Sequence, residues 1–593
     1  MRPNDPGRAR AVVAWGLFLA AAAFAPALYE WESTGWGDWG WFHHSWEVGR
    51  VAILRWGEVP LWDPHHCGGV TTWGQPQAQL FAPTWWITGL PFGTEIGHKL
   101  FVLLHFVVGF AGLFTLARRH YGMTSAAAAL AAVGWAFSGF FGWRASGGHA
   151  TFLAFHYLPW ILHFWRLAHD RPRYCAPVAL LMALVLFEGG TYAFPFTFLV
   201  LLFDVFVVLL RPRPRWGVFR TGILAGGLTA LIGAMRLWPI WRTMQRFPRE
   251  TELEDTQTVA HVLESLVARE PHPWHWGHRW VWAEYSSYVG LAVVALAAYG
   301  AVFALRPRRV GVSRLGTWHL LGGAAVFGAL AMGNVDAWWP WPLLHELPMF
   351  GNFHVPSRFH VVLTFYLALL AGLAVDRTTR GLNRVSLRAA TQAGAAALAW
   401  LLVASVAIDV VSNDVRIAAR WGNPPIEAER ADRFHLVGPH GYLEQYMTYP
   451  ERNVGTIACY DPVPWEVSRR LWTGEGPQAR VEPRGAGEVT ATSRTNHTLR
   501  AEVALEEPAR VVFNQNFDPD WRLWASGEEL TPVEDDGRLA ADVGAGAARI
   551  EGRYAPPDLP WSPALTLLDL LLAAAPWVWR RMRRALAGRR RAE

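Results

Sequence analysis

The chain has 593 residues, of which 52% are hydrophobic, 14% aromatic and only 17% charged. A soluble protein usually carries about 25% charged residues, so the composition excludes an ordinary soluble protein and predicts a large lipid-facing surface. The net charge of +6 does not indicate nucleic-acid binding, because nearly all basic residues are arginines that cluster between apolar runs and form no binding face.

The predicted elements begin with an apolar run after Arg2, Arg8 and Arg10, so we expect the N-terminus to stay in the cytosol. About a dozen runs have the length that crosses about 30 Å of hydrocarbon. They lie at 11–28, 98–117, 125–142, 150–167, 174–190, 191–210, 221–240, 285–305, 317–333, 357–376, 390–411 and 563–580. With these twelve spans, both termini and every arginine-rich short loop are cytosolic. The sequence therefore predicts a mostly α-helical, multi-pass protein of the bacterial plasma (inner) membrane.

The predicted domains follow from these spans. Residues 1–411 form a transmembrane domain whose first outer loop covers 29–97, and the apolar segment 80–92 in that loop is too short to span. Residues 412–480 read as a mixed α/β region outside the membrane. Residues 481–560 show alternating, β-branched strands separated by Gly/Asp turns, which predicts a β-sandwich. Residues 561–593 are the last helix and a basic cytosolic tail.

The first outer loop concentrates acidic residues, histidines and tryptophans. Asp38, Asp63 and Glu32 are candidate catalytic carboxylates, since an outer carboxylate at the membrane surface can act as a general base. The alternative for Asp38 is an N-cap of the helix that follows it, and the two roles are compatible. Trp39 and Trp62 are candidates for contact with a sugar, although tryptophans at span ends usually belong to the aromatic belt.

This layout resembles the GT-C fold glycosyltransferases, and most closely the bacterial YfhO-like family. The resemblance covers nearly the whole chain and depends on the order of its motifs. These are Gly37-Asp38, the segment 57–64 with Cys67-Gly68-Gly69, Pro76-Gln77 before Pro83, the segment 353–359, the segment 517–521, and Gly527 with 552–554. It implies that Asp38 is the catalytic base and that the donor is a polyprenyl-phosphate-linked sugar.

Charged groups near the outer ends of spans are candidates for holding that donor, because charges are costly within a membrane and usually mark function or pairing. A guanidinium offers a planar fork to phosphate oxygens. Arg358 is the main candidate; the alternatives are an arginine that only snorkels to the membrane surface or one that forms an ion pair with Glu188. Further substrate-binding candidates are Arg236, Arg144, Glu188, His149, His43 and His44.

No cofactor is required by these patterns, but they admit a divalent metal on imidazole and carboxylate ligands. His43 and Glu47 lie four apart and share a helix face, and His65 and His66 are further weak candidates. Three cysteines exclude a CxxC metal site. Cys67 and Cys459 both fall on the predicted outer side, so they either form a bridge or remain unpaired thiols.

Three functions fit the sequence. The first is a membrane glycosyltransferase that moves a sugar from a polyprenyl-phosphate carrier to an envelope glycan or lipid acceptor on the outer face, with membrane lipid and no nucleic acid as partners. The second is a polyprenyl-linked sugar transporter or flippase, which would grip phosphate without breaking a bond. The third is a non-catalytic envelope assembly protein that acts through its β-domain.

Overall fold

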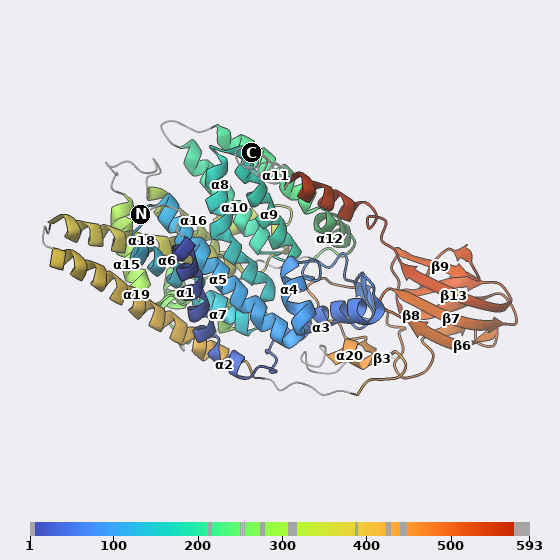
Figure 1. Ribbon diagram of the computed structural model, residues 1–593. Helices are drawn as coiled ribbons and strands as arrows, with labels where there is room; N and C mark the ends of the chain where they lie inside the picture. The colour runs from blue at the N-terminus through green and yellow to red at the C-terminus, as the bar shows by residue number, and fades with distance from the viewer. Residues whose placement is uncertain are drawn as a thin grey trace, which may run out of the picture.

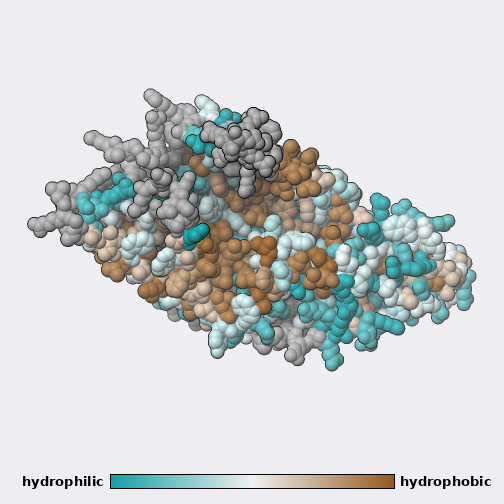
Figure 2. All heavy atoms as spheres, viewed as in Figure 1, coloured by the Kyte–Doolittle hydropathy of each residue, from teal (hydrophilic) through white to brown (hydrophobic). Residues whose placement is uncertain are grey.

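The computed structural model describes residues 6–210, 216–249, 251, 253, 255–272, 279–305, 317–385, 389–422, 429–438 and 448–573. The molecule is elongated, with a bundle of helices at one end and a body of strands at the other (Figure 1). On the face drawn in Figure 2, hydrophobic residues gather over the bundle and hydrophilic residues over the strand-rich end. The two ends therefore differ as a membrane part and a water-exposed part should.

The first half of the bundle contains α1 (Pro6–Ala23), α2 (Ala25–Tyr29), α3 (Trp39–Arg50), η1 (Val51–Arg55), α4 (Pro83–Phe92), α5 (Thr94–His120), α6 (Ser125–Ala136), α7 (Gly139–Ser146), η2 (Ala150–Tyr157), α8 (Leu158–Ala168), η3 (Pro172–Tyr174), α9 (Cys175–Phe187) and α10 (Ala193–Leu209). Local signals explain several boundaries. Thr124 caps the alanine-rich α6 by accepting a hydrogen bond from the Ala127 amide. Pro83 begins α4, where a missing amide hydrogen has no cost.

The second half contains α11 (Gly217–Ile232), α12 (Ala234–Arg246), α13 (Val259–Val267), α14 (Trp282–Tyr285), α15 (Gly290–Ala304), α16 (Trp318–Ala331), α17 (Pro340–His345), η5 (Phe350–Asn352), η6 (Pro356–Phe359), α18 (His360–Val385) and α19 (Ala389–Ala418). Helix α18 packs against α6, α15 and α16. In the span Pro356–Asn383, which overlaps most of α18, 94% of the most apolar window is buried. This helix is therefore the centre of the bundle.

Within the described residues every predicted span overlaps helix, and residues 574–580 of the last span lie outside them; the number of twelve spans is not confirmed. Five helical segments in the described residues are long and apolar enough to cross a membrane, or six if α11 and α12, bent by 76° at their junction, form one span. The others are shorter apolar helices, including Ser562–Ala573 before the end of the described chain. The arginine-rich segments 211–215 and 306–316 lie outside the described residues. Twelve spans and cytosolic termini stay predictions.

The strand-rich end consists of two antiparallel sheets. One has the order β10-β9-β13-β7-β6 and the other β11-β12-β8-β5. Their bounds are β5 (Ala479–Glu482), β6 (Gly487–Arg494), β7 (Thr498–Leu505), β8 (Ala509–Asn516), β9 (Trp521–Ala525), β10 (Glu528–Leu530), β11 (Val533–Asp535), β12 (Arg538–Val543) and β13 (Gly546–Tyr554). Along β7 every second side chain is buried, from Leu499 to Leu505. The alternation that predicted a sandwich thus reflects one buried face per strand.

Smaller elements connect the two ends. The first outer loop forms the short pair β1 (Trp62–Asp63) and β2 (Val70–Thr71), and the outer region adds β3 (His435–Val437), α20 (Tyr449–Arg452) and β4 (Val454–Thr456). On α12, Arg242 forms ion pairs with Asp520 (2.9 Å) and Asp558 (2.7 Å). The Trp73 indole N–H also donates to Asp558 at 2.6 Å. These contacts hold the strand-rich end against the membrane part.

Candidate functional site

The site begins where the first outer loop turns into α3. Gly37 has a φ of +67°, and the amide of Asp38 donates to the Gly147 carbonyl at 3.1 Å. Gly148 has a φ of +83°, and a Cβ there would lie 2.0 Å from the Trp39 nitrogen. Only glycine allows this approach. The two turns therefore pack backbone to backbone and bring Asp38 beside His149.

The Asp38 carboxylate does not cap the helix. Asp38 occupies the N-cap position of α3 without a side-chain capping bond. Its Oδ1 accepts a hydrogen bond from the Tyr460 hydroxyl at 2.6 Å, and its Oδ2 lies 3.1 Å from His149 Nε2. The capping alternative is thus not the arrangement observed, since two side chains from distant segments hold the carboxylate instead.

The protonation of His149 follows from its other neighbour. Its Nδ1 lies 2.7 Å from Arg144 Nη1. A guanidinium only donates hydrogen bonds, so Nδ1 must accept, and the ring hydrogen sits on Nε2. His149 is therefore a neutral imidazole that donates to Asp38.

Behind His149 lies a buried cluster of three charged groups, which we call the Arg–Glu–Arg cluster: Arg144, Glu284 and Arg358. Arg358 donates to both carboxylate oxygens of Glu284, at 2.8 and 3.1 Å, and Arg144 Nη2 lies 2.8 Å from Glu284 Oε2. Phe152 packs against both guanidinium groups, at 4.9 and 5.0 Å from its ring centroid. The cluster is buried and carries one more positive than negative charge, and its three side chains hold one another in place through these ion pairs.

The three members of this cluster come from three separate candidate spans. Arg144 lies near the end of Ser125–Ser146, Glu284 near the start of Trp282–Ala304, and Arg358 near the start of Pro356–Asn383. These span ends therefore meet on one side of the bundle, the side on which Asp38 lies. Of the charges noted near span ends in the sequence, Arg144 and Arg358 belong to this cluster.

Asp38 is ionised at neutral pH and open to solvent. Burial raises the pKa of its carboxyl group, but the hydrogen bonds from His149 and Tyr460 outweigh burial and leave the pKa below its ordinary value. About 30% of the side chain is exposed, against 8% for Glu284. Of the two carboxylates Asp38 and Glu284, Asp38 is therefore the one that a substrate can reach.

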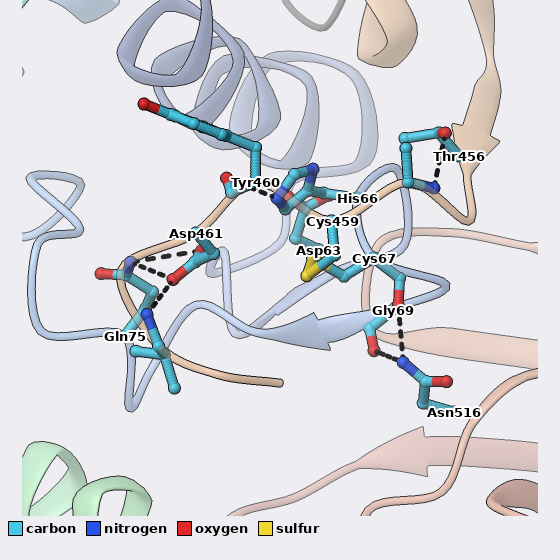
Figure 3. The surroundings of a disulfide bond; sticks show 12 residues. Asp63, His66, Cys67, Gly69, Gln75, Thr456, Cys459, Tyr460, Asp461 and Asn516 are labelled. Carbon is cyan, nitrogen blue, oxygen red and sulfur yellow. Dashed lines mark hydrogen bonds between the residues drawn. A yellow bond between two sulfur atoms is a disulfide. The ribbon is translucent and has the colours of Figure 1, made fainter. Parts of the chain in front are cut away.

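Tyr460 reaches Asp38 because a disulfide anchors its segment to the first outer loop (Figure 3). Cys459, the residue before Tyr460, is bonded to Cys67 across a sequence separation of 392. Beside the bridge, His66 Nε2 contacts the Tyr460 carbonyl at 3.1 Å, and the Cys67 amide donates to the Ala458 carbonyl at 3.2 Å. The bridged alternative for these cysteines is therefore the one observed, and it connects the outer region to the site.

Asp63 lies deeper in the same loop and is only 5% exposed. Its carboxylate contacts His44 Nε2 at 2.7 Å and accepts from the His65 amide at 2.8 Å. Burial raises its pKa, but His44, His65 and His66 outweigh burial and lower the pKa to about 2. Glu32 is exposed and has no hydrogen bond or ion pair among the described residues. Neither carboxylate contacts the Arg–Glu–Arg cluster within the described part, so their catalytic roles stay predictions.

Two other candidates, Glu188 and Arg236, are buried and form hydrogen bonds that connect separate segments of the chain. Glu188 is fully buried and accepts hydrogen bonds from Thr84 and Tyr157, both at 2.8 Å, beside His105 Nε2 at 2.8 Å. Its partner is not Arg358, whose ion pair is with Glu284. Arg236 is also fully buried, and it donates to the carbonyls of Trp73, Gln75 and Ala78. These contacts shape the first outer loop.

The two tryptophans are covered by protein. Trp39 is fully buried and donates to the Ala145 carbonyl at 2.8 Å. Trp62 is 1% exposed and packs against Trp521 and Tyr554. Their sugar-binding role stays a prediction, and in this conformation their faces pack against other side chains.

The metal candidates do not form one site. The rings of His43 and His98 stack at 4.5 Å, while Glu47 lies 3.1 Å from Arg50 and accepts from Thr94 at 2.7 Å. Burial lowers the pKa of His43 to about 3, so its ring is neutral. His65 Nδ1 contacts the Val454 carbonyl. Within the described residues one set has ligand spacing, His66 with Cys67 and Cys459, and its two sulfurs are joined in the disulfide, so thiolate ligands are absent.

Sequence reasoning did not identify Glu284 and Tyr460. Glu284 directly precedes the predicted span 285–305, and nothing local distinguishes it from other acidic residues near span ends. Tyr460 had one signal, because it follows a cysteine on the same predicted side as Cys67. Assuming that bridge would have placed Tyr460 beside the first outer loop.

Comparisons with known proteins place the membrane part in a family. A family model described as "6-pyruvoyl-tetrahydropterin synthase related domain; membrane protein" matches residues 87–413, more than half of the chain. No curated protein matches the chain.

Several solved structures of glycosyltransferases are similar at low identity. The arabinofuranosyltransferase AftD from Mycobacteria is 15% identical with a TM-score of 0.48, over 79% of this chain and 32% of that one. The oligosaccharyltransferase of Archaeoglobus fulgidus is 12% identical with a TM-score of 0.48, over 78% and 65%. ArnT from Cupriavidus metallidurans, bound to undecaprenyl phosphate, is 14% identical with a TM-score of 0.37, over 77% and 90%.

The chain spans only 32% of the arabinofuranosyltransferase. Likeness at this level does not assign a reaction, a donor or a catalytic residue.

Proposed function

The chain belongs to the family of membrane proteins with a 6-pyruvoyl-tetrahydropterin synthase-related domain, and we propose that it is a membrane glycosyltransferase. It moves a sugar from a polyprenyl-phosphate-linked donor to an envelope glycopolymer or lipid on the outer face of the membrane. One observation carries the proposal. An ionised, partly exposed carboxylate, Asp38, is held by Tyr460 and His149 where the ends of three candidate spans meet.

In the proposed reaction an acceptor hydroxyl attacks the anomeric carbon of the donor sugar. The new C–O bond forms as the bond from the anomeric carbon to the phosphate oxygen breaks, and that electron pair leaves with the phosphate. The acceptor proton goes to Asp38. Because the pKa of Asp38 is lowered, it is a weak base, and the proton moves late, once the acceptor oxygen has become acidic by bonding to carbon.

The neighbours of Asp38 fix its geometry for this step. Each carboxylate oxygen has two lone-pair directions, so Oδ1 and Oδ2 can still accept from a substrate hydroxyl while bonded to Tyr460 and His149. The Arg–Glu–Arg cluster holds His149 through Arg144. A carboxylate oriented from two sides loses little freedom when the acceptor binds, which is the advantage of a preorganised site.

Arg358 remains our candidate for contact with the donor phosphate, in a changed role. Its Nε and Nη2 are engaged by Glu284. A phosphate could bind the remaining Nη1, or could displace Glu284. Glu284 thus sets how strongly the site attracts an anion, since the two arginines exceed the one buried carboxylate by a single charge.

The transporter alternative is supported by one feature. Helices α11 and α12 form a pair bent by 76°, and broken helices are typical of carriers. A carrier would move the lipid-linked sugar across the membrane with its phosphate bond intact. The bent pair does not account for the ionised, partly exposed Asp38 carboxylate that Tyr460 and His149 hold, so the enzyme proposal explains more of the structure.

Mass analysis separates the two functions. The purified protein in nanodiscs is mixed with a polyprenyl-phosphate-linked sugar and an envelope glycan fraction from cells that lack the protein. The proposal expects a glycan mass increased by one sugar and an equal amount of free polyprenyl phosphate. An intact donor after prolonged incubation, together with donor movement between leaflets of proteoliposomes, would establish the carrier instead.

A further inference from the structure

A cavity lies between the middle of the first outer loop and the strand-rich end, apart from the Asp38 site. Its volume is about 220 Å³, and Arg55 and Trp56 line it from η1 and the residue after it. The arginines that line it outnumber the carboxylates by five to one; the six residues are Arg55, Arg430, Arg433, Arg494, Arg500 and Asp432. A cavity with this excess of positive charge attracts an anion.

The floor of the cavity is built from Arg494 and Gln515. Arg494 Nη2 donates to Gln515 Oε1 at 3.1 Å, and its guanidinium lies 4.5 Å from the Phe434 ring centroid. Among the described residues, Arg494 has no carboxylate partner, whereas Arg500 on the rim pairs with Glu551 at 3.5 Å. The amide nitrogen of Gln515 is buried without a hydrogen-bond partner, in a side chain that is only 2% exposed. A buried donor without an acceptor is unfavourable, so an acceptor that reaches the floor would be stabilised there.

The rest of the lining suits hydroxyl groups. Asn453, Gln478 and Asn514 line the cavity with Gln515. Side-chain amides both donate and accept, as sugar hydroxyls require. Arginine forks match the planar oxygens of a carboxylate or the face of a phosphate. The volume is below the roughly 300–1,000 Å³ of drug-sized sites, which fits one charged sugar unit and not a whole chain.

We propose that this cavity binds an anionic sugar unit of the acceptor glycan, such as a uronic acid, and holds the polymer while its other end reaches Asp38. The identification as an acceptor rests on the proposed function, but the binding itself does not. A flat membrane surface could touch rim arginines such as Arg430 and Arg433, which are exposed, but it could not reach Gln515 at the floor. An anionic lipid is therefore the alternative that the test must distinguish.

The cavity is separate from the transfer site but connected to it through the first outer loop. Phe434, which packs on Arg494, also packs against the His65 ring at 5.6 Å. Residue 67 of the same loop carries the disulfide that fixes Tyr460 on Asp38. Binding of the polymer in the cavity should therefore strengthen its apparent affinity for the protein. It should leave the rate of the chemical step at Asp38 unchanged.

The test is calorimetric binding to the full-length protein in nanodiscs of neutral phosphatidylcholine. The probes are an oligogalacturonate, a neutral malto-oligosaccharide of equal length, and inorganic phosphate. We expect the oligogalacturonate to bind and the neutral sugar not to bind. Arg494→Gln and Gln515→Leu should each weaken binding by about 10-fold or more, the usual weight of a hydrogen bond to a charged group. Arg433→Gln on the rim repeats the test if a floor variant unfolds.

The matched control is Arg522→Gln, an exposed arginine on β9 that does not line the cavity; it should bind like the parent. Equal binding of the neutral sugar, or unchanged binding in both floor variants and in Arg433→Gln, would overturn the proposal. The alternative is tested in nanodiscs that contain phosphatidylglycerol. If this anionic lipid competes for the cavity and the oligogalacturonate shows no binding of its own, the cavity is assigned to lipid. Absence of sugar transfer by the parent protein, with oligogalacturonate binding intact, would reject the proposed function and leave the binding site standing.

Discussion

At the scale of single residues, the account depends on how one carboxylate is held. Asp38 sits where a helix cap is expected, yet its oxygens bind Tyr460 and His149. His149 in turn is fixed as a neutral donor by Arg144. The chain therefore forgoes a capping bond, worth about 1 kcal/mol, and keeps a charged oxygen pair oriented at an accessible surface.

Tyr460→Phe should shift the pH dependence of transfer. The hydrogen bond from Tyr460 helps to keep the pKa of Asp38 low, so its removal raises that pKa. Protonated Asp38 cannot take a proton, and the rate should therefore begin to fall at a higher pH than in the parent. At neutral pH the rate should stay within about tenfold of the parent, short of the ~10²–10⁴-fold loss of a missing base. Profiles of transfer rate against pH check this, with Tyr299→Phe on the exposed face of α15 as control. If the rate of Tyr460→Phe falls at the same acidic pH as that of the parent, Tyr460 does not lower the pKa of Asp38.

Asp63→Asn should destabilise the first outer loop. The ionised carboxylate pairs with His44 in a buried site, and breaking such a pair costs about 3–5 kcal/mol. The pKa of Asp63 is lowered to about 2, so its stabilisation is fully present above its ordinary pKa near 3.9 and disappears as the pH falls from about 4 to 2. Denaturation followed by tryptophan fluorescence should show a large difference from the parent at pH 7 that shrinks in that range. Equal stabilities at pH 7 would show that the pair contributes nothing.

At the scale of elements, the sequence predicted individual helices and strands better than the contacts between them. The apolar run 98–117 coincides with α5, and the alternation after residue 481 coincides with the strands, because both patterns depend on neighbouring side chains. Arg144, His149 and Arg358 were recognised one at a time. Glu284 and Tyr460 were missed, since their contacts cross 74 and 422 positions of sequence. No local period encodes a contact of that separation.

Replacing both bridging cysteines, as Cys67→Ser with Cys459→Ser, should release the Tyr460 segment. Loss of a native disulfide lowers the free energy of unfolding by about 2–5 kcal/mol. The transfer rate of the variant should also begin to fall at a higher pH, as in Tyr460→Phe, because the hydrogen bond from Tyr460 to Asp38 loses its anchor. Transfer rates and unfolding temperatures in detergent measure both effects. Cys175→Ser, at the buried free cysteine of α9, is the control. A double variant with the parent's pH profile would show that the disulfide does not position Tyr460.

At the scale of the whole molecule, the site requires one side of the membrane. The ends of three candidate spans, the first outer loop and the segment with Tyr460 all meet at Asp38. The family match covers residues 87–413 and so excludes both Asp38 and Tyr460. The proposed chemistry thus belongs to the assembled chain, and the membrane part supplies the support.

Reporter fusions should place the strand-rich end outside the cell. A periplasmic reporter inserted at Gly544, an exposed position in the turn before β13, should be active. A cytosolic reporter in the segment 306–316 should be active as well, as the arginine-rich loops predict. A cytosolic signal from Gly544 would place Asp38 on the inner face and overturn the outer-face reaction.

The most direct measurement is the transfer rate of Asp38→Asn. Asparagine keeps the size of the side chain and can turn its oxygen toward His149 and its amide toward the Tyr460 hydroxyl, so packing should survive while the basic carboxylate is lost. The account predicts a parental unfolding temperature, parental donor binding, and transfer slower by about 10²–10⁴-fold. Full transfer activity in a well-folded Asp38→Asn protein would contradict the assignment of Asp38 as the general base.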